Sequence, residues 1–196
     1  MAMNVPMLPD SVEKFGNLFT RGVARTILWV MGWKIEGNFP DCEKMMLIVA
    51  PHTSNWDFFI GITAMFAIGF RARWLGKHTI FRKPFGTYMK WMGGIPVDRT
   101  KPGNVVDQVI SEIESSDSIV LGMSPEGTRK KLERWKTGFY RIARGANIPI
   151  VPVTFDYKTR KVVIMSLFVP TGELEADILY LQGLFKGEHA KYPGKY

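Results

Sequence analysis

Short apolar runs alternate with amphipathic stretches along most of the chain. Runs of about four to eight apolar residues, bounded by proline, glycine or charged residues, predict buried strands. Longer stretches with apolar residues at helical spacing predict helices. We expect strands at 45–50, 71–77, 95–99, 118–124, 148–157 and 161–168, and helices at 56–70, 84–94, 104–117, 138–147 and 173–185. This alternation predicts an α/β fold, and the apolar strands predict a largely parallel sheet flanked by helices.

The segment before the first predicted strand has a different pattern. Arg21 and Arg25 are one turn apart, and tryptophans lie near one end of the segment. This pattern suits an amphipathic helix lying in a membrane interface, and it suits equally a helix that packs on its own domain. We expect a membrane-associating segment at 1–35 and a single domain at 36–196. The apolar residues that recur at helical spacing are Phe15, Leu18, Phe19, Val23, Ile27 and Val30.

Length and charge narrow the class of protein. A chain of 196 residues can bury a substantial core within one domain. Its net charge of +8 favours anionic partners, but the basic residues are scattered and no nucleic-acid motif is present, so we expect no nucleic-acid partner. Cys42 is the only cysteine, which excludes an internal disulfide and favours a reducing compartment. No run reaches the roughly 18 apolar residues of a membrane span, and the start lacks the pattern of a secretory signal.

One histidine and one aspartate stand at a predicted strand-to-helix turn, in "APHTSNWDFF" at 50–59. On one continuous helix, residues five apart would lie about 140° apart and could not meet. The two side chains can meet only if His52 lies in the loop and Asp57 in the first helical turn, with Ser54 or Asn55 as the N-cap. The carboxylate would then orient the imidazole, which would act as a general base. The alternative is a capping box of Ser54 and Asp57 beside a loop histidine.

No side-chain nucleophile accompanies this pair. "GMSPE" has a glutamate where the Gly-x-Ser-x-Gly motif needs glycine, and Cys42 has no evident base. The three histidines lie far apart in the sequence, so we expect no metal site. A basic His52 would therefore act on a hydroxyl or amine that the substrate brings.

A second polar segment, "MSPEGTRKK", follows another predicted strand. Because sites in such sheets gather at the carboxyl ends of strands, we expect it near His52. Glycine allows close backbone approach, and arginine offers a planar fork suited to phosphate. Read alone, the segment also fits a charged surface turn.

Four ordered blocks resemble the glycerophospholipid acyltransferase family, which contains the 1-acylglycerol-3-phosphate acyltransferases. They are "HTSNWD", "GKHTIFRKPFGTYMKWMGGIPVDR", "PEGTR" and "IPIVPV", and they span about 45–155. The second block departs from the family pattern, with "KHTI" where many members have Lys-Glu-Leu. The resemblance implies that His52 is the general base and Asp57 its orienting partner. It places an acceptor site with an anionic headgroup at Lys77, Arg99, Glu126, Gly127, Thr128 and Arg129.

The resemblance also implies the reaction. The family transfers an acyl group from acyl-coenzyme A or acyl carrier protein to a lysophospholipid hydroxyl, without a metal or other cofactor. The short chain suggests a peripheral, monotopic enzyme on the cytoplasmic face of the membrane. Lysophosphatidic acid is the expected acceptor, and another lysolipid, such as a lyso-ornithine lipid, is the alternative. Three further alternatives are a thioester hydrolase with the same dyad, a non-catalytic lipid-binding protein of the same fold, and a basic membrane-surface adaptor.

Overall fold

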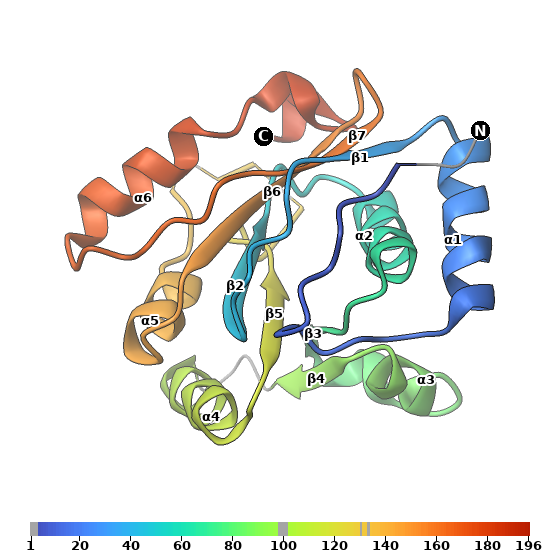
Figure 1. Ribbon diagram of the computed structural model, residues 1–196. Helices are drawn as coiled ribbons and strands as arrows, with labels where there is room; N and C mark the ends of the chain where they lie inside the picture. Colours follow the sequence, from blue (N-terminus) through green and yellow to red (C-terminus); the bar gives the residue numbers. More distant parts are fainter. Residues whose placement is uncertain (1–3, 98–101, 130, 133) are drawn as a thin grey trace.

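A seven-stranded sheet forms the centre of the computed structural model, which describes residues 4–97, 102–129, 131–132 and 134–196 (Figure 1). All neighbouring strands run parallel except the antiparallel pair β6–β7. The predicted single-domain α/β fold with a largely parallel sheet is confirmed. In spatial order the strands are β1 (Lys34–Glu36), β7 (Lys161–Ile164), β6 (Ile150–Asp156), β2 (Lys44–Val49), β5 (Ile119–Met123), β3 (Ala72–Lys77) and β4 (Gly94–Val97).

Helices cover both faces of the sheet (Figure 1). One face is covered by α2 (Asn55–Ile68), and α1 (Leu18–Val30) packs on the outside of α2. The other face is covered by α4 (Pro102–Ser115), α5 (Gly138–Gly145) and α6 (Leu174–Gly183). A shorter helix, α3 (Gly86–Trp91), lies beside β4, and single 3-10 turns occur at η1 (His78–Phe81), η2 (Gly187–His189) and η3 (Pro193–Lys195).

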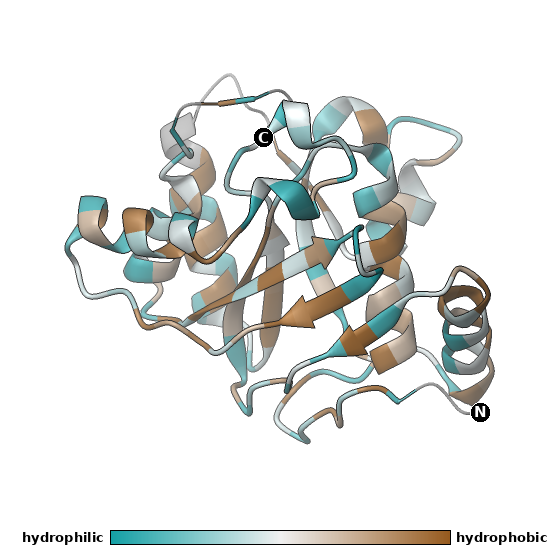
Figure 2. Cartoon of the chain, turned by 90° about the horizontal axis from the view of Figure 1, so that it is seen from above, coloured by the Kyte–Doolittle hydropathy of each residue, from teal (hydrophilic) through white to brown (hydrophobic). Residues whose placement is uncertain are grey.

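Two hydrophobic cores lie on opposite sides of the sheet. Along β2, Met45 and Leu47 belong to the core under α2, while Met46 and Ile48 belong to the core under α4 and α5. This division follows from the two-residue period of a strand, which turns successive side chains to opposite faces. Figure 2 shows hydrophobic segments on the strands and on the helices that cover them. Both faces of β2 are buried, which explains its continuous apolar sequence.

Sheet pairing brings the two polar segments of the sequence together. In the parallel ladder of β2 and β5, Ile48 pairs with Met123. The loops that follow these strands therefore leave the sheet at the same edge, where binding sites of open α/β sheets are found. The sequence predicted these elements within a few residues, but it missed β1, which is only three residues long.

The N-terminal segment is integrated into the domain. Ala24 and Leu28 of α1 are buried against α2, and Trp33 and Ile35 are buried in the same core. The domain boundary expected after residue 35 therefore runs through β1. The other face of α1 is exposed and apolar, and it carries Leu18, Phe19, Val23, Trp29 and Val30.

The two arginines of α1 face the protein. Arg25 donates a hydrogen bond from Nε to the carbonyl oxygen of Ala67 at 2.9 Å. The Arg21 guanidinium lies against Gly69, which ends α2 in a left-handed conformation with φ +95°. Both cations thus stand at the carboxyl end of α2, where they complement its dipole. In a helix lying in a membrane interface these arginines would meet anionic lipid, but here they contact α2 instead. Among the described residues, no helix is long and apolar enough to cross a membrane.

Candidate active site

His52 and Asp57 meet in the geometry that the sequence required. His52 lies in the loop after β2, Ser54 is the N-cap of α2, and Asp57 lies in the first turn. The His52 Nδ1 atom is 3.1 Å from Asp57 Oδ2. The His52 side chain is 27% exposed and that of Asp57 is 1% exposed. The imidazole is therefore accessible to a substrate while its carboxylate partner is shielded.

The dyad and the capping box share one carboxylate. Asp57 Oδ2 also accepts hydrogen bonds from the backbone N–H groups of Thr53 and Ser54, at 2.9 and 2.8 Å. Ser54 Oγ accepts from the N–H of Trp56 at 3.1 Å. The His52–Asp57 contact and the capping box are thus both present, because the cap is what turns the Asp57 carboxylate toward His52. The cap thus occupies the backbone N–H groups of Thr53, Ser54 and Trp56.

The charge of Asp57 is stabilised in place. Burial by itself would raise the pKa of this carboxyl. Hydrogen bonds from His52, from the Tyr157 hydroxyl and from the Ser54 backbone outweigh burial and hold the pKa below its usual value of 3.8. Asp57 is therefore a carboxylate at neutral pH, which is the form that stabilises an imidazolium.

Glu126 connects the loop after β5 with the loop after β2. Its carboxylate oxygens accept from the His52 N–H at 3.1 and 3.0 Å, and Oε2 accepts from Ser124 Oγ at 2.8 Å. Burial raises the pKa of Glu126, and the bonds from Ser124 and His52 only partly oppose that effect. Glu126 is 5% exposed and is not among the residues that line the cleft. We expected it to contact the acceptor; instead its carboxylate lies behind the cleft wall and holds the histidine loop.

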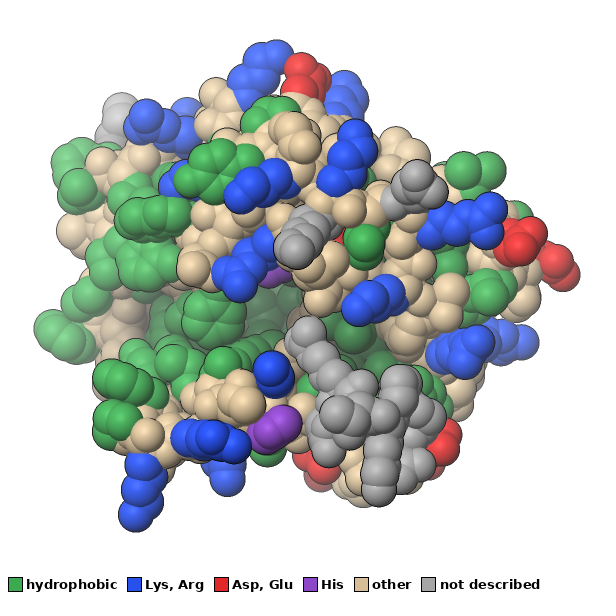
Figure 3. All heavy atoms as spheres, turned by 180° about the vertical axis from the view of Figure 1, so that it is seen from behind, with side chains coloured by type: hydrophobic (Ala, Val, Ile, Leu, Met, Phe, Trp, Pro, Cys, Tyr) green, Lys and Arg blue, Asp and Glu red, His purple; other side chains and the backbone are tan. Residues whose placement is uncertain are grey.

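A large cleft opens beside the dyad. It has a volume of about 1610 Å³ and runs from the loops at the strand ends into the space between α2 and the sheet. Figure 3 shows it as a hollow with hydrophobic side chains inside and Lys and Arg side chains around it. Its apolar lining includes Leu47, Val49, Met65, Phe70, Val153 and Phe155. An apolar cleft with polar groups at its mouth suits an amphiphilic ligand.

The predicted acceptor residues fall into three groups. Lys77, Gly127, Thr128 and Arg129 line the cleft together with His52. Gly127 adopts φ +62°, a backbone conformation that side chains other than glycine rarely take. Glu126 lies behind the wall, as described above. Arg99 lies outside the described residues.

Two residues with contacts at the site were not singled out in the sequence. Lys136 lies beside Gly127 and lines the cleft. The loop from β5 to α5 contains it, and its position after a strand end was the signal that could have identified it. The second is Tyr157, whose hydroxyl donates to Asp57 Oδ1 at 2.7 Å. Tyr157 directly follows β6, so the same rule applies to it.

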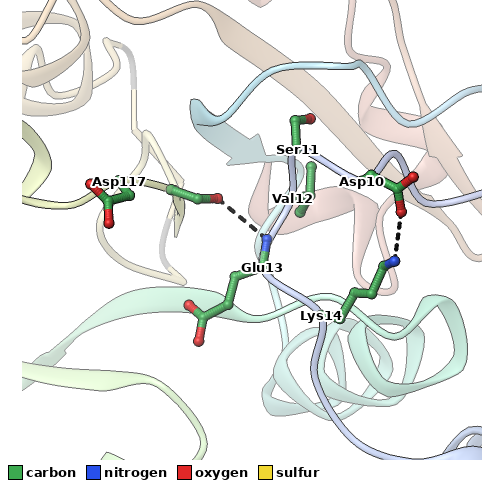
Figure 4. A pocket seen from close by; sticks show the side chains of 7 residues that line it. Asp10, Ser11, Val12, Glu13, Lys14 and Asp117 are labelled. Atoms are coloured by element: carbon green, nitrogen blue, oxygen red, sulfur yellow. Dashed lines mark hydrogen bonds and ion pairs between the residues drawn. The ribbon is translucent and has the colours of Figure 1, made fainter.

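A smaller hollow lies at the opposite edge of the sheet, where Ser118 precedes β5 (Figure 4). Its volume is about 500 Å³. Asp10 and Lys14 form an ion pair across 2.6 Å there, and Ser118 Oγ accepts from the Glu13 N–H at 3.3 Å. This hollow contains no dyad and is far from the loops that follow β2 and β5, so it does not belong to the site.

The fold and this site define an α/β protein with a histidine–aspartate pair at the mouth of an apolar cleft. The chain belongs to the Acyltransferase family, whose family model matches residues 33–156. The match includes the dyad, the loop of Glu126 and all the parallel strands at the centre of the sheet.

Named relatives and one solved structure agree with the family. The chain is 29% identical over 167 residues to the 1-acyl-sn-glycerol-3-phosphate acyltransferase of Escherichia coli, covering 80% of this chain and 64% of that protein. It is 29% identical over 143 residues to the enzyme of that name from Haemophilus influenzae, covering 68% and 58%. The chain thus spans less than two thirds of these relatives. The crystal structure of the Thermotoga maritima 1-acyl-sn-glycerophosphate acyltransferase PlsC has the same fold, with a TM-score of 0.61 at 16% identity, covering 85% of this chain and 75% of that one.

Proposed function

We propose that this protein transfers an acyl group from a thioester donor, acyl-coenzyme A or acyl carrier protein, to the free hydroxyl of a lysophospholipid such as 1-acylglycerol-3-phosphate. The observation that carries the proposal is the His52–Asp57 pair, 3.1 Å apart, at the mouth of an apolar cleft with cations around it. The names of the relatives support the acceptor.

The reaction follows from the orientation of the imidazole. Because Asp57 engages Nδ1, the other ring nitrogen of His52 takes the proton of the acceptor hydroxyl. The hydroxyl oxygen forms a bond to the thioester carbonyl carbon, and the carbon–sulfur bond breaks. The proton then passes from His52 to the departing thiolate. The step uses no acyl-enzyme intermediate and no cofactor besides the thioester.

The cations at the cleft favour an anionic headgroup. Lys77, Arg129 and Lys136 are exposed, line the cleft and form no ion pair within the described parts of the chain. Arginine and lysine bind phosphate through charge-assisted hydrogen bonds. The apolar interior would then hold hydrocarbon while the phosphate stays near the mouth, close to His52.

The enzyme would work at a membrane surface, on its cytoplasmic face. Exposed apolar side chains gather on the side of the cleft where α1, α2 and α3 lie (Figure 3). Tryptophan and phenylalanine beside basic residues are typical of proteins that bury one face in the headgroup boundary. The exposed residues on these helices are Leu18, Phe19, Val23, Trp29 and Val30 of α1, Trp56, Phe58 and Phe59 of α2, and Tyr88 and Trp91 of α3.

One assay tests the proposal. The purified protein is incubated with labelled acyl-coenzyme A or acyl carrier protein and a panel of lysolipids, and products are identified by mass spectrometry. We expect diacylated phospholipid from lysophosphatidic acid. A product from lyso-ornithine lipid alone would change the acceptor, and free fatty acid without acylated lipid would indicate a hydrolase. Lipid binding without turnover would contradict the proposed activity.

A further inference from the structure

We infer that Tyr157 is a positioning residue for the dyad: its hydroxyl holds the Asp57 carboxylate so that the second oxygen faces His52. This inference rests on the proposed function, and it adds Tyr157 to the pair of His52 and Asp57 that serves as general base there. The residue is 100 positions away from Asp57 in the chain, and β6 delivers it to the site.

The two oxygens of Asp57 have separate partners. Oδ1 accepts from the Tyr157 hydroxyl at 2.7 Å, while Oδ2 faces His52 Nδ1 at 3.1 Å and the cap N–H groups. Asp57 as a whole is 2% exposed, so bulk water cannot readily replace a lost donor at Oδ1. A carboxylate held at both oxygens cannot rotate about its Cβ–Cγ bond without breaking a hydrogen bond.

Tyr157 is itself held from several sides. Its backbone N–H donates to the carbonyl oxygen of His189 at 2.9 Å. Its ring meets the buried ring of Trp33 edge to face, with centroids 5.0 Å apart. The Lys191 ammonium lies 5.8 Å from the centre of the tyrosine ring. The hydroxyl therefore has a defined position, set by β6, β1 and the segment around η2.

The hydroxyl acts as a donor throughout the working pH range. Burial and the bond to Asp57 raise the pKa of Tyr157 well above its ordinary value of 10.0. A neutral donor on Oδ1 draws charge away from the carboxylate. Removing it leaves more of that charge to act on the imidazolium of His52, so the protonated form of His52 becomes more stable.

Other titratable groups around the dyad stay in place when the hydroxyl is removed. Glu126, from the loop after β5, accepts from the His52 backbone. Lys191 also lies over the ring of Trp56 at 4.5 Å, and the N–H of Tyr192 donates to Thr53 Oγ1 at 3.3 Å. None of these contacts uses the Tyr157 hydroxyl, so a phenylalanine at 157 tests that oxygen alone.

The test compares Tyr157→Phe with Tyr180→Phe. Tyr180 lies on α6, is 57% exposed and stacks on Phe168, so it is a matched control for loss of a hydroxyl. We expect Tyr157→Phe to lower kcat about tenfold, the effect of one hydrogen bond to a charged group, with both KM values nearly unchanged. The acid limb of the pH–rate profile should move to higher pH. A kcat and pH profile equal to those of the control would overturn the inference.

Two further measurements separate positioning from damage to the fold. On an Asp57→Asn background, Tyr157→Phe should have little additional effect, because the two residues act as one unit; full additivity would contradict the inference. Without any substrate, NMR titration of the imidazole signals should show the His52 midpoint at higher pH in Tyr157→Phe than in the unmodified protein. This readout decides the role of Tyr157 even if no lysolipid is acylated, an outcome that would refute only the proposed function.

Discussion

His52 and Asp57 show how much one short turn can determine. The N-cap at Ser54, the first turn of α2 and the dyad use the same few atoms, and Asp57 Oδ2 serves all three. Glu126 then fixes the backbone of this turn from the neighbouring loop. His52 is thus held by two buried carboxylates: Glu126 accepts from its backbone N–H, and Asp57 lies against its ring.

At the scale of the residue, replacing His52 would remove the general base of the proposed reaction. We expect His52→Ala to lower kcat by about 10²–10⁴, the usual contribution of a positioned general base. The melting temperature should change little, because the side chain is partly exposed. Steady-state kinetics and a melting curve on the purified variant measure both. Near-full turnover in a folded variant would remove His52 from the mechanism.

The raised pKa of Glu126 predicts that the free energy of unfolding depends on pH. Its folded-state pKa is raised above 4.5, so the folded protein holds this proton more tightly than the unfolded chain. The associated stability is present below about pH 4.5 and is lost as pH rises through the folded-state pKa. We expect Glu126→Gln, which cannot ionise, to lose less stability than the unmodified protein over that rise, as measured by urea unfolding at several pH values.

The control is Asp57→Asn, for which the sign is opposite. The folded-state pKa of Asp57 lies below 3.8, so its contribution is present above that value and is lost as pH falls through the folded-state pKa. This variant should be less stable than the unmodified protein above pH 3.8, and it should lose less stability as the pH falls through the acid range. Identical pH profiles for the unmodified protein and Glu126→Gln would show that Glu126 has no raised pKa.

At the scale of the element, α1 has two faces with different roles. Ala24 and Leu28 are buried against α2, while Leu18, Phe19 and Trp29 are 87%, 77% and 62% exposed. Deleting the whole segment would remove β1 and part of the core, so it cannot test membrane binding. Substitutions on the exposed face can, because they leave the packed face intact.

We therefore expect the triple substitution of Leu18, Phe19 and Trp29 by serine to reduce binding to anionic vesicles, with little change in melting temperature. Co-sedimentation measures the binding. The matched control changes Leu179 and Tyr180 to serine; these are also exposed but lie on α6, across the sheet. Equal binding by the triple variant and the unmodified protein would exclude α1 from the membrane surface.

A substitution on the buried face of α1 should lower stability and leave vesicle binding unchanged. Leu28 is fully buried, so Leu28→Ala should lower the free energy of unfolding by about 2–5 kcal/mol. Vesicle binding by the fraction that remains folded should be retained. Chemical denaturation followed by circular dichroism measures the first quantity.

At the scale of the whole molecule, the cleft separates two kinds of surface. Its interior is apolar and lies between α2 and the sheet, while Lys77 at the end of β3 and Arg129 and Lys136 in the loop between β5 and α5 stand at its mouth. The net charge of +8 adds a long-range attraction for anions. This arrangement would orient a lysophospholipid with its phosphate near the mouth and its hydrocarbon within the protein.

Arg129→Ala and Lys136→Ala should each raise the KM of the lysophospholipid more than that of the thioester donor. The reason is that both side chains line the cleft beside Gly127, in the loop next to His52. Lys34→Ala on β1, at the other edge of the sheet, is the control for a lost positive charge. A rise in the donor KM alone would assign these cations to the thioester instead.

Local pattern predicted the strands, the helices and the turn that holds the dyad. His52, Ser54 and Asp57 lie within six residues, and one N-cap is enough to bring the side chains of His52 and Asp57 together. Hydrogen bonds between neighbouring residues and the periodicity of apolar side chains are properties of the sequence itself. The fold class and the contact between His52 and Asp57 therefore follow from the sequence alone.

Tertiary structure decided what depends on contacts distant in the sequence. The sequence could not indicate that Tyr157 bonds to Asp57, that Glu126 accepts from the His52 backbone, or that Arg25 faces the carboxyl end of α2. Each of these contacts spans more than 40 positions and arises from sheet order or helix packing. The free energy that positions these groups comes mainly from burying the two hydrophobic cores. Because many residues distant in the sequence contribute to those cores, no local sequence pattern indicates these contacts.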